Sequence, residues 1–195
     1  MKTILTLLFL LFSSSVVAED ISDFEIDNIS IGDSILKFYK ETDFNNFARI
    51  EYPSSDTFYG YGIPVEYYKK SNLNYDTVSF ILKKNDSKFR IYSVKGIVFY
   101  PQNFEKCLDQ KEKIIKEIKK EFKIANDQSY EDYFGNKYGS SIAYVSNFEL
   151  NDGMIRIFCS KWDKNNSRSK NWRDTFNIAI SSNEYLNWLD KEAYK

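Results

Sequence analysis

The two cysteines constrain the fold of this chain more than any other feature of its sequence. Cys107 falls in an amphipathic pattern over residues 104–122 that predicts a helix, and Cys159 falls in a strand-like pattern over residues 154–162. A redox-active pair is normally as close as C-x-x-C, whereas these residues are 52 positions apart. We therefore predict a structural disulfide between Cys107 and Cys159, which ties the helix to the strand and stabilises the fold by roughly 4 kcal/mol.

The N-terminal segment has the pattern of a cleavable secretory signal. Lys2 precedes a short apolar run over residues 4–12, and Val16 and Ala18 place small residues at the −3 and −1 positions. The run is too short for an uncleaved anchor, which needs about 20 apolar residues to span a bilayer. We predict a signal peptide over residues 1–18, a single mature domain over residues 19–195, and no membrane span after cleavage.

The absence of histidine limits the chemistry available to the chain. Ser-His-Asp and Cys-His systems need an imidazole, and a zinc or iron site would have to use carboxylates and two cysteines, which is an unusual ligand set. The glycines form neither of the common phosphate-binding motifs. We therefore expect no cofactor, and an enzyme of this sequence would depend on carboxylate, lysine or tyrosine chemistry.

The charge of the chain gives no argument for a polyanionic partner. Removing Lys2 with the signal leaves 26 basic against 28 acidic residues, a formal net charge of −2. A balanced charge of this kind does not favour binding to nucleic acid or to an anionic membrane surface. We expect no nucleic-acid partner.

The order of the patterns predicts the fold class. A strand pair over residues 78–100 precedes the helix that carries Cys107, and three further strands follow it, over residues 142–150, 154–162 and 172–181. Asp152 and Gly153 are typical of a tight hairpin turn, and Ser181 and Glu184 have the spacing of a capping box that opens a last helix. We predict one α+β domain, an antiparallel sheet with helices packed on one face.

An aromatic segment between residues 47 and 70 offers a candidate binding surface. It has an irregular pattern that fits either a long loop or short strands. Tyrosine rings at a surface suit the binding of sugars, peptides or proteins, but the same rings can also cover one face of a sheet with their hydroxyl groups in water. The candidates are Tyr52, Phe58, Tyr59, Tyr61, Tyr67 and Tyr68.

The polar segment over residues 126–139 offers the best alternative for catalysis. We interpret it as a connector between helix and sheet, and it contains Asp127, Glu131 and Asp132. Carboxylates that converge in a cleft with a raised pKa could serve a histidine-free hydrolase. Their spacing does not match a calcium loop, and acids in loops are usually solvated.

Several of these features together resemble a family of small exported proteins of AT-rich marine bacteria to which no activity is assigned. The resemblance covers nearly the whole mature chain. It depends on residues 29–34, the strand over residues 91–100, the following helix with one cysteine, and residues 155–159 before Trp172. It implies a Gram-negative periplasm and a structural disulfide, and it transfers no functional residues.

Two functions remain open from the sequence. The first is a non-catalytic periplasmic binding or accessory module, a monomer whose aromatic surface at Tyr52 to Tyr68, extended by the segment from Tyr130 to Tyr138, binds a protein, peptide or glycan. The second is a hydrolase that uses the acids of residues 126–139. We favour the binding module, because the sequence lacks catalytic motifs and its tyrosines cluster.

Overall fold

A computed structural model describes residues 20–53, 57–63, 75–101, 103–121, 126–165 and 172–195. Its main sheet consists of β3 (Ala48–Ile50), β4 (Phe58–Ile63), β5 (Thr77–Lys83), β6 (Ile91–Phe99), β7 (Asn126–Tyr133), β8 (Ile142–Glu149), β9 (Gly153–Lys161) and β10 (Thr175–Ser182). The helices are α2 (Phe104–Glu121) and α4 (Asn183–Lys191). Smaller elements are η1 (Ile21–Asp23), β1 (Glu25–Ile26), β2 (Ile29–Ser30), η2 (Ile35–Lys37), η3 (Glu41–Asn46) and η4 (Asn136–Tyr138). The predicted signal peptide, residues 1–18, lies outside the described residues.

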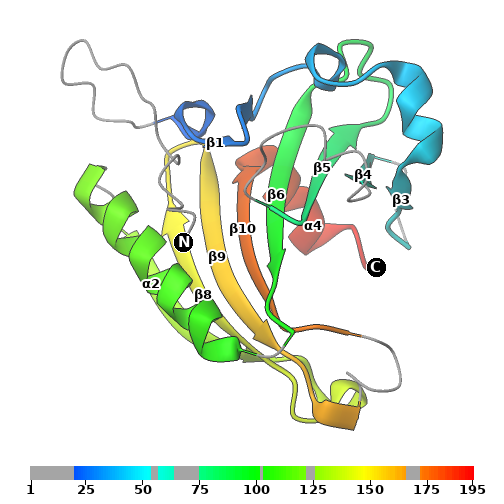
Figure 1. The fold of residues 1–195 in the computed structure, drawn as a ribbon. Helices are drawn as coiled ribbons and strands as arrows, with labels where there is room; N and C mark the ends of the chain where they lie inside the picture. Colours follow the sequence, from blue (N-terminus) through cyan, green and yellow to red (C-terminus); the bar gives the residue numbers. More distant parts are fainter. Residues whose placement is uncertain (1–19, 54–56, 64–74, 102, 122–125, 166–171) are drawn as a thin grey trace.

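The sheet is antiparallel throughout and has the order β3-β4-β5-β6-β10-β9-β8-β7. The last strand in sequence, β10, lies between β6 and β9 and so joins the two halves of the sheet (Figure 1). The predicted hairpin at Asp152 and Gly153 is confirmed, because Leu150 N donates to Gly153 O and Glu149 pairs with Met154. The prediction of a large antiparallel sheet with a few helices is confirmed.

One strand appears where the sequence analysis placed a connector. Residues 126–133 form β7, which pairs along its whole length with β8, from Asn126 opposite Glu149 to Tyr133 opposite Ile142. β7 is an edge strand, and the side chains described along it are exposed on both faces. Such a strand has no buried face, so its sequence lacks the apolar alternation by which strands are recognised.

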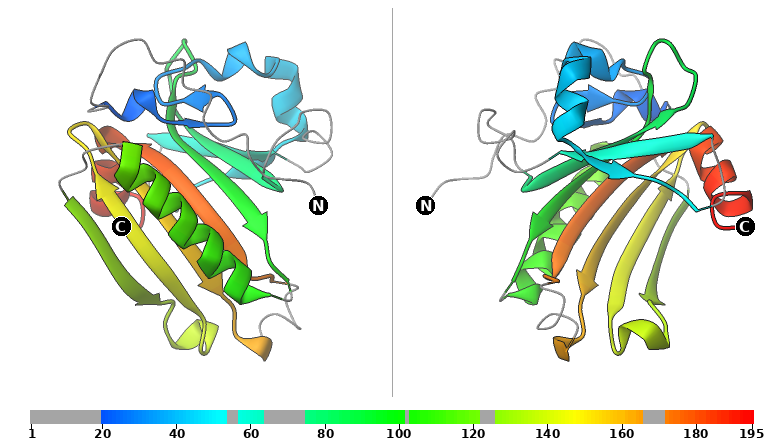
Figure 2. Two further views of the ribbon diagram at one scale, coloured as in Figure 1. Left: turned by 60° about the vertical axis from the view of Figure 1, so that its left-hand side comes forward. Right: turned by 90° about the vertical axis from the view of Figure 1, so that its right-hand side faces the viewer.

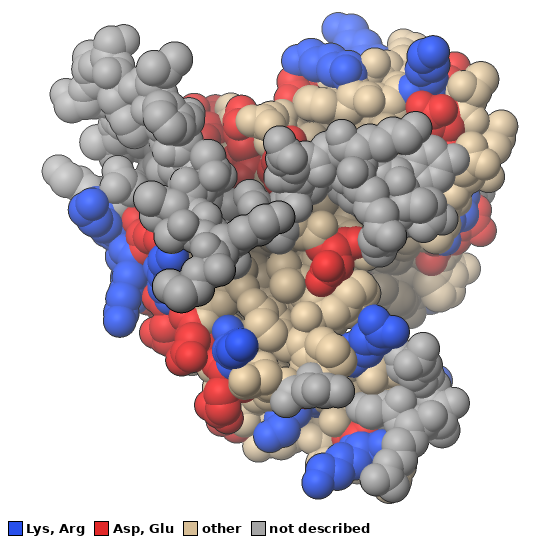
Figure 3. Space-filling model, in the orientation of Figure 1, with Lys and Arg blue, Asp and Glu red and all other residues tan. Residues whose placement is uncertain are grey.

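The helix α2 covers one side of the sheet, which we call the helix face. Its apolar stripe, with Cys107, Ile114, Ile115 and Ile118, packs on β9 and β10. The same core also includes the buried side chains of η1, β1, β2 and η3, which cover the other end of this face (Figure 1). The outer surface of α2 carries charges of both signs, as Figure 3 shows, which is typical of a solvated helix face.

The helix α4 packs on the opposite side of the sheet. Tyr185 and Trp188 form a second buried cluster with Phe58 and Ile81, whereas the neighbouring Phe80 belongs to the first core. Successive side chains of a strand point to opposite faces, so α2 and α4 lie on different faces, as both views of Figure 2 show. The predicted packing of helices on one face is therefore not confirmed.

The start of α4 also differs by one residue from the prediction. Ser182, not Ser181, is the N-cap, and its hydroxyl accepts a hydrogen bond from Tyr185 N at 3.4 Å. Ser181 still belongs to β10, where its hydroxyl bonds to that of Ser93 at 2.8 Å. The strand continues for one residue more than the capping-box spacing indicated.

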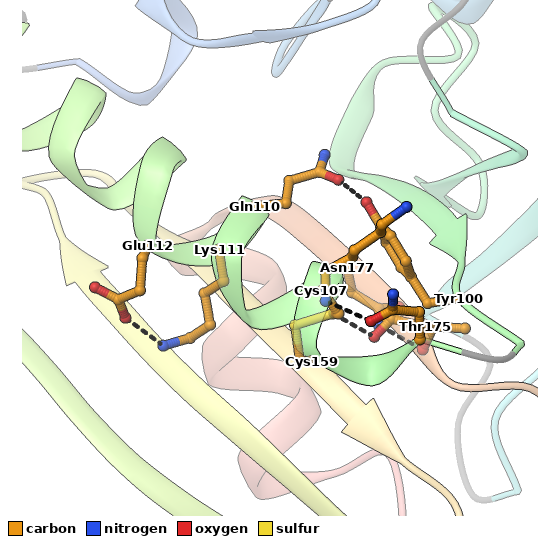
Figure 4. Close-up of a disulfide and its surroundings, with 10 residues drawn as sticks. Tyr100, Cys107, Gln110, Lys111, Glu112, Cys159, Thr175 and Asn177 are labelled. Carbon is orange, nitrogen blue, oxygen red and sulfur yellow. Dashed lines mark hydrogen bonds and ion pairs between the residues drawn. A yellow bond between two sulfur atoms is a disulfide. The ribbon is translucent and has the colours of Figure 1, made fainter.

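The disulfide Cys107–Cys159 is present, as predicted. It links α2 to β9 with a Cα–Cα distance of 6.0 Å, and both residues are fully buried (Figure 4). Cys159 lies between Phe176 of β10 and Tyr144 of β8, so the bridge fastens the helix near the middle of the sheet.

Candidate ligand-binding face

The aromatic candidates from the sequence do not lie on one surface. Phe58 is 2% exposed and packs with Tyr52 against α4, whereas Tyr61 is 9% exposed and belongs to the core of the helix face. Tyr59 is half-buried beneath the Arg49 guanidinium, which lies 4.4 Å from the ring centroid. Tyr67 and Tyr68 lie outside the described residues. Binding by these residues stays a prediction, and the four described rings serve two different cores.

Tyr52 and Tyr185 illustrate this structural role. Their hydroxyl oxygens lie 2.5 Å apart, and Tyr52 also packs edge-on against Trp188, with ring centroids 4.8 Å apart. Burial raises the pKa of both tyrosines above the ordinary value. Each hydroxyl therefore stays protonated and fastens α4 to the segment before β4.

The acids proposed for catalysis do not converge. Asp127, Glu131 and Asp132 are spread along the edge strand β7 and are all exposed. By strand alternation Asp127 and Glu131 point to one face and Asp132 to the other. Asp127 forms an ion pair with Lys119 of α2, which accounts for its orientation.

Of the described helices, α4 covers one end of the side of the sheet opposite α2, and we call this side the open face. Among the described elements, α4 lies at one end of this face and η4 at the other, with the sheet between them (Figure 2, right). Its side chains come from the strand positions that alternate with the core. Those used below are Lys95 of β6, Ala179 of β10, Arg156 and Phe158 of β9, Asn147 of β8 and Tyr130 of β7.

Arg156 is held in place by neutral oxygen atoms. Its Nε donates to Asn147 Oδ1 at 3.0 Å, and its Nη2 donates to Tyr130 Oη at 3.0 Å. Asn147 Nδ2 donates in turn to the same tyrosine oxygen at 3.4 Å. These contacts orient the guanidinium on the sheet without neutralising its charge.

Lys95 lies in the same row of side chains, two strands away. Ala179 pairs with Arg156 on one side and with Lys95 on the other. The Lys95 ammonium reaches over the strand between them, because its Nζ lies 5.4 Å from the ring centroid of Phe158 on β9. Burial lowers the pKa of Lys95, since no acid group of the described residues stabilises its charge.

Four aromatic rings form a cluster at the end of the sheet away from α4. We call Phe134, Tyr138, Trp162 and Trp172 the end cluster. Trp162 stacks on Phe134 with centroids 4.9 Å apart and contacts Trp172 at 4.4 Å, and Tyr138 lies 5.7 Å from Trp172. All four rings are half-buried, so each keeps part of its surface toward solvent.

Hydrogen bonds accepted by two carboxylates and one serine hydroxyl connect the segments of the end cluster. Asp174 Oδ1 accepts from Trp162 N at 2.8 Å, and burial raises the pKa of this carboxyl group. Asp163 Oδ2 accepts from Ser140 Oγ at 2.8 Å, and Ser141 Oγ accepts from Asp163 N at 2.9 Å. These hydrogen bonds link the segments that carry Phe134, Tyr138 and Trp162 to one another and to the start of β10.

The alternation of side chains along β9 is a sequence signal for the open face. In β9, Ile155, Ile157 and Cys159 share the buried face, so Met154, Arg156, Phe158 and Ser160 must share the other. An arginine and a phenylalanine on the outward side of a central strand indicate a surface that is only part-covered. The end cluster had no such signal, because its rings come from three separate segments.

The described residues contain no group of three or more potential metal ligands, and none of their helices combines the length and apolar character that a membrane crossing needs. Comparisons with protein-family models, with curated proteins and with solved structures find no match for this chain.

Proposed function

We propose that this protein is an exported, non-catalytic binding module whose ligand lies along the open face and contacts the end cluster. The observation that carries the proposal is the end cluster itself: four half-buried rings held at one end of a sheet face that the described elements leave uncovered. Rigid aromatic rings with hydrogen-bonding neighbours suit sugar rings and peptide side chains. The ligand is therefore a glycan, a peptide or an extended segment of a protein.

The arrangement of the acids favours binding over catalysis. A general acid–base pair must reach the same substrate atoms, and Asp127, Glu131 and Asp132 point away from one another along an exposed strand. Lys95 and Arg156 are the ionisable groups placed centrally on the open face, and an arginine cannot serve as a general base near neutral pH. A hydrolase using the β7 acids is the weaker candidate.

The periplasm of a Gram-negative bacterium is the proposed location. A disulfide between fully buried cysteines persists in an oxidising compartment, and the N-terminal segment has the pattern of a cleavable signal. Intact-mass measurement of the exported protein tests this part directly, because cleavage after Ala18 leaves Glu19 as the first residue.

Binding is tested by tryptophan fluorescence on the mature protein. Trp162 and Trp172 belong to the end cluster, whereas Trp188 is 5% exposed in the α4 core, so a bound ligand changes the emission of the first two. Probes are libraries of defined oligosaccharides and peptides. Hits are then measured by calorimetry with Trp162→Ala and with Tyr133→Ala, an exposed ring on β7 outside the end cluster.

We expect Trp162→Ala to weaken binding at least tenfold, about 1.4 kcal/mol, while Tyr133→Ala leaves it unchanged. Circular dichroism confirms that both variants fold. A ligand that binds equally to both variants contradicts the placement of the site, and so does one whose binding depends on Tyr59 and Tyr61 instead.

A further inference from the structure

The contacts of Arg156 leave much of its binding capacity unused. A guanidinium has five N–H donors, and two are used in the bonds to Asn147 and Tyr130. Both acceptors are neutral, so the positive charge is oriented but not paired. Arginine groups oriented in this way match the geometry of carboxylate and phosphate groups, which they bind through two parallel hydrogen bonds.

Lys95 brings a second cation to the same place. It lies across Ala179 from Arg156, and two strand spacings separate their backbones by about 10 Å. Its side chain leans toward β9, where its ammonium lies over the Phe158 ring. A part-buried ammonium without an acidic partner is destabilised, and an anion placed beside it would relieve this.

Ala179 separates the two cations along their row of side chains. Its methyl group is the smallest side chain in the row that runs from Asn147 through Arg156 to Lys95. The acids nearest on this face are Glu149, one row away, and Asp132, two rows away; both are exposed, and neither has an ion pair with Lys95 or Arg156 among the described residues. The guanidinium leans from β9 toward β8 and β7, and the Lys95 ammonium leans over β10 toward β9, so the two positive charges lie on either side of β9.

We propose that Lys95 and Arg156 form a binding site for an oxyanion, a carboxylate or phosphate group, held over β9 beside the Phe158 ring on the open face. Arg156 supplies the parallel donors and Lys95 supplies the point charge. Because this site deepens the proposed function, the ligand of the open face would be an acidic chain, with its anionic group near the sheet centre and its rings toward the end cluster.

The test uses simple anions as probes. The mature protein, with its disulfide intact, is titrated with sodium phosphate and separately with sodium acetate at constant ionic strength, and the backbone amide signals are followed by NMR. The variants are Lys95→Met and Arg156→Gln. The matched control is Lys161→Met, which also removes one positive charge placed over an aromatic ring, but on the helix face beside Phe104.

We expect saturable shifts of the Phe158 amide and of its strand neighbours, with binding at least tenfold weaker in Lys95→Met and Arg156→Gln and unchanged in Lys161→Met. Stronger binding of phosphate than of acetate assigns the site to phosphate groups, and the reverse order assigns it to carboxylates. The absence of saturable shifts overturns the proposal, as do shifts that all three variants weaken equally.

Failure of this site and failure of the proposed function give different results. If a neutral oligosaccharide or peptide binds at the end cluster and the anions have no effect, the oxyanion site is wrong and the binding module stands. If the anions bind between Lys95 and Arg156 but Trp162→Ala has no effect on any ligand, the oxyanion site stands and the end cluster is not the binding surface.

Discussion

At the residue scale, close packing over the sheet makes one glycine indispensable. Gly96 lies on the helix face of β6, and a Cβ at this position would lie 2.6 Å from ring carbons of the buried Tyr75. Gly62 on β4 differs, because a Cβ there would meet nothing closer than 3.9 Å. Comparing a replacement of Gly96 with a replacement of Gly62 therefore separates the effect of steric contact from the general effect of replacing a glycine in a strand.

We expect Gly96→Ala to lower the free energy of unfolding by about 1–3 kcal/mol, because the Tyr75 ring must move out of a packed core. Gly62→Ala should change it by no more than about 0.5 kcal/mol. Urea denaturation of both variants measures the two effects. Equal losses in the two variants would show that the Tyr75 contact does not limit the site.

Lys95 gives the open face a predictable response to pH. Burial lowers the pKa of Lys95 in the folded chain. At pH values between this lowered pKa and the ordinary pKa of lysine, Lys95 is protonated in the unfolded chain and largely neutral in the folded chain. The free energy of unfolding therefore rises with pH in this range. The charged groups on the same face include Arg156, Glu149 and Asp132, and the ion pair of Lys83 with Glu184 at the α4 end.

Lys95→Met should therefore be more stable than the parent protein at pH 7, and this advantage should shrink as the pH rises toward 10. Urea denaturation at several pH values gives the difference between the two proteins directly. Lys161→Met controls for the loss of one amine on the other face. A stability difference that does not vary with pH would contradict the desolvation of Lys95.

At the element scale, the disulfide fastens α2 to β9 while each element is built from its own local pattern. We expect reduction, or the double replacement Cys107→Ala and Cys159→Ala, to lower the free energy of unfolding by about 2–4 kcal/mol. Urea denaturation with and without a reducing agent measures this loss. The reducing agent should not change the unfolding midpoint of the double variant, which has no disulfide. An unchanged midpoint in the reduced parent protein would contradict the prediction, and would show that packing of Ile115 and Ile118 alone holds the helix.

The elements that could be predicted are those with a buried face. The stripe through Cys107, Ile114 and Ile118 predicts α2 within one residue of its observed end, and the alternation of Ile155, Ile157 and Cys159 predicts β9. β7 could not be found, because an edge strand exposed on both faces has no apolar period. The face on which α4 packs also has no local signal, since it depends on how β10 enters the sheet.

The candidate site was harder to predict than the fold for a similar reason. Tyr52, Phe58 and Tyr61 have the composition of a binding surface, but the same rings suit a core, and only the strand pairing shows that they pack against α4 or beneath η3. The row from Arg156 to Lys95 crosses three strands whose order does not follow the sequence. Local patterns cannot show which outward side chains become neighbours across such a sheet.

At the scale of the whole molecule, the sheet ends in two unequal edges. β3 has three residues, whereas β7 has eight and presents the longer edge to solvent. A long open edge can pair with another copy of the chain, and charged side chains are a common protection against this. The three acids of β7 are placed to provide that protection, which explains them without a catalytic role.

We predict a monomer whose solubility depends on these acids. The triple replacement Asp127→Asn, Glu131→Gln and Asp132→Asn should lead to self-association that increases with protein concentration, because neutral edge strands no longer repel each other. Sedimentation velocity measures the association. The matched control neutralises Glu105, Asp109 and Glu112, three exposed acids on α2, and so changes the net charge equally without touching an edge. If both triple variants associate, the cause is the change in net charge. If the β7 variant stays monomeric, the geometry of the edge strand protects it and the acids do not.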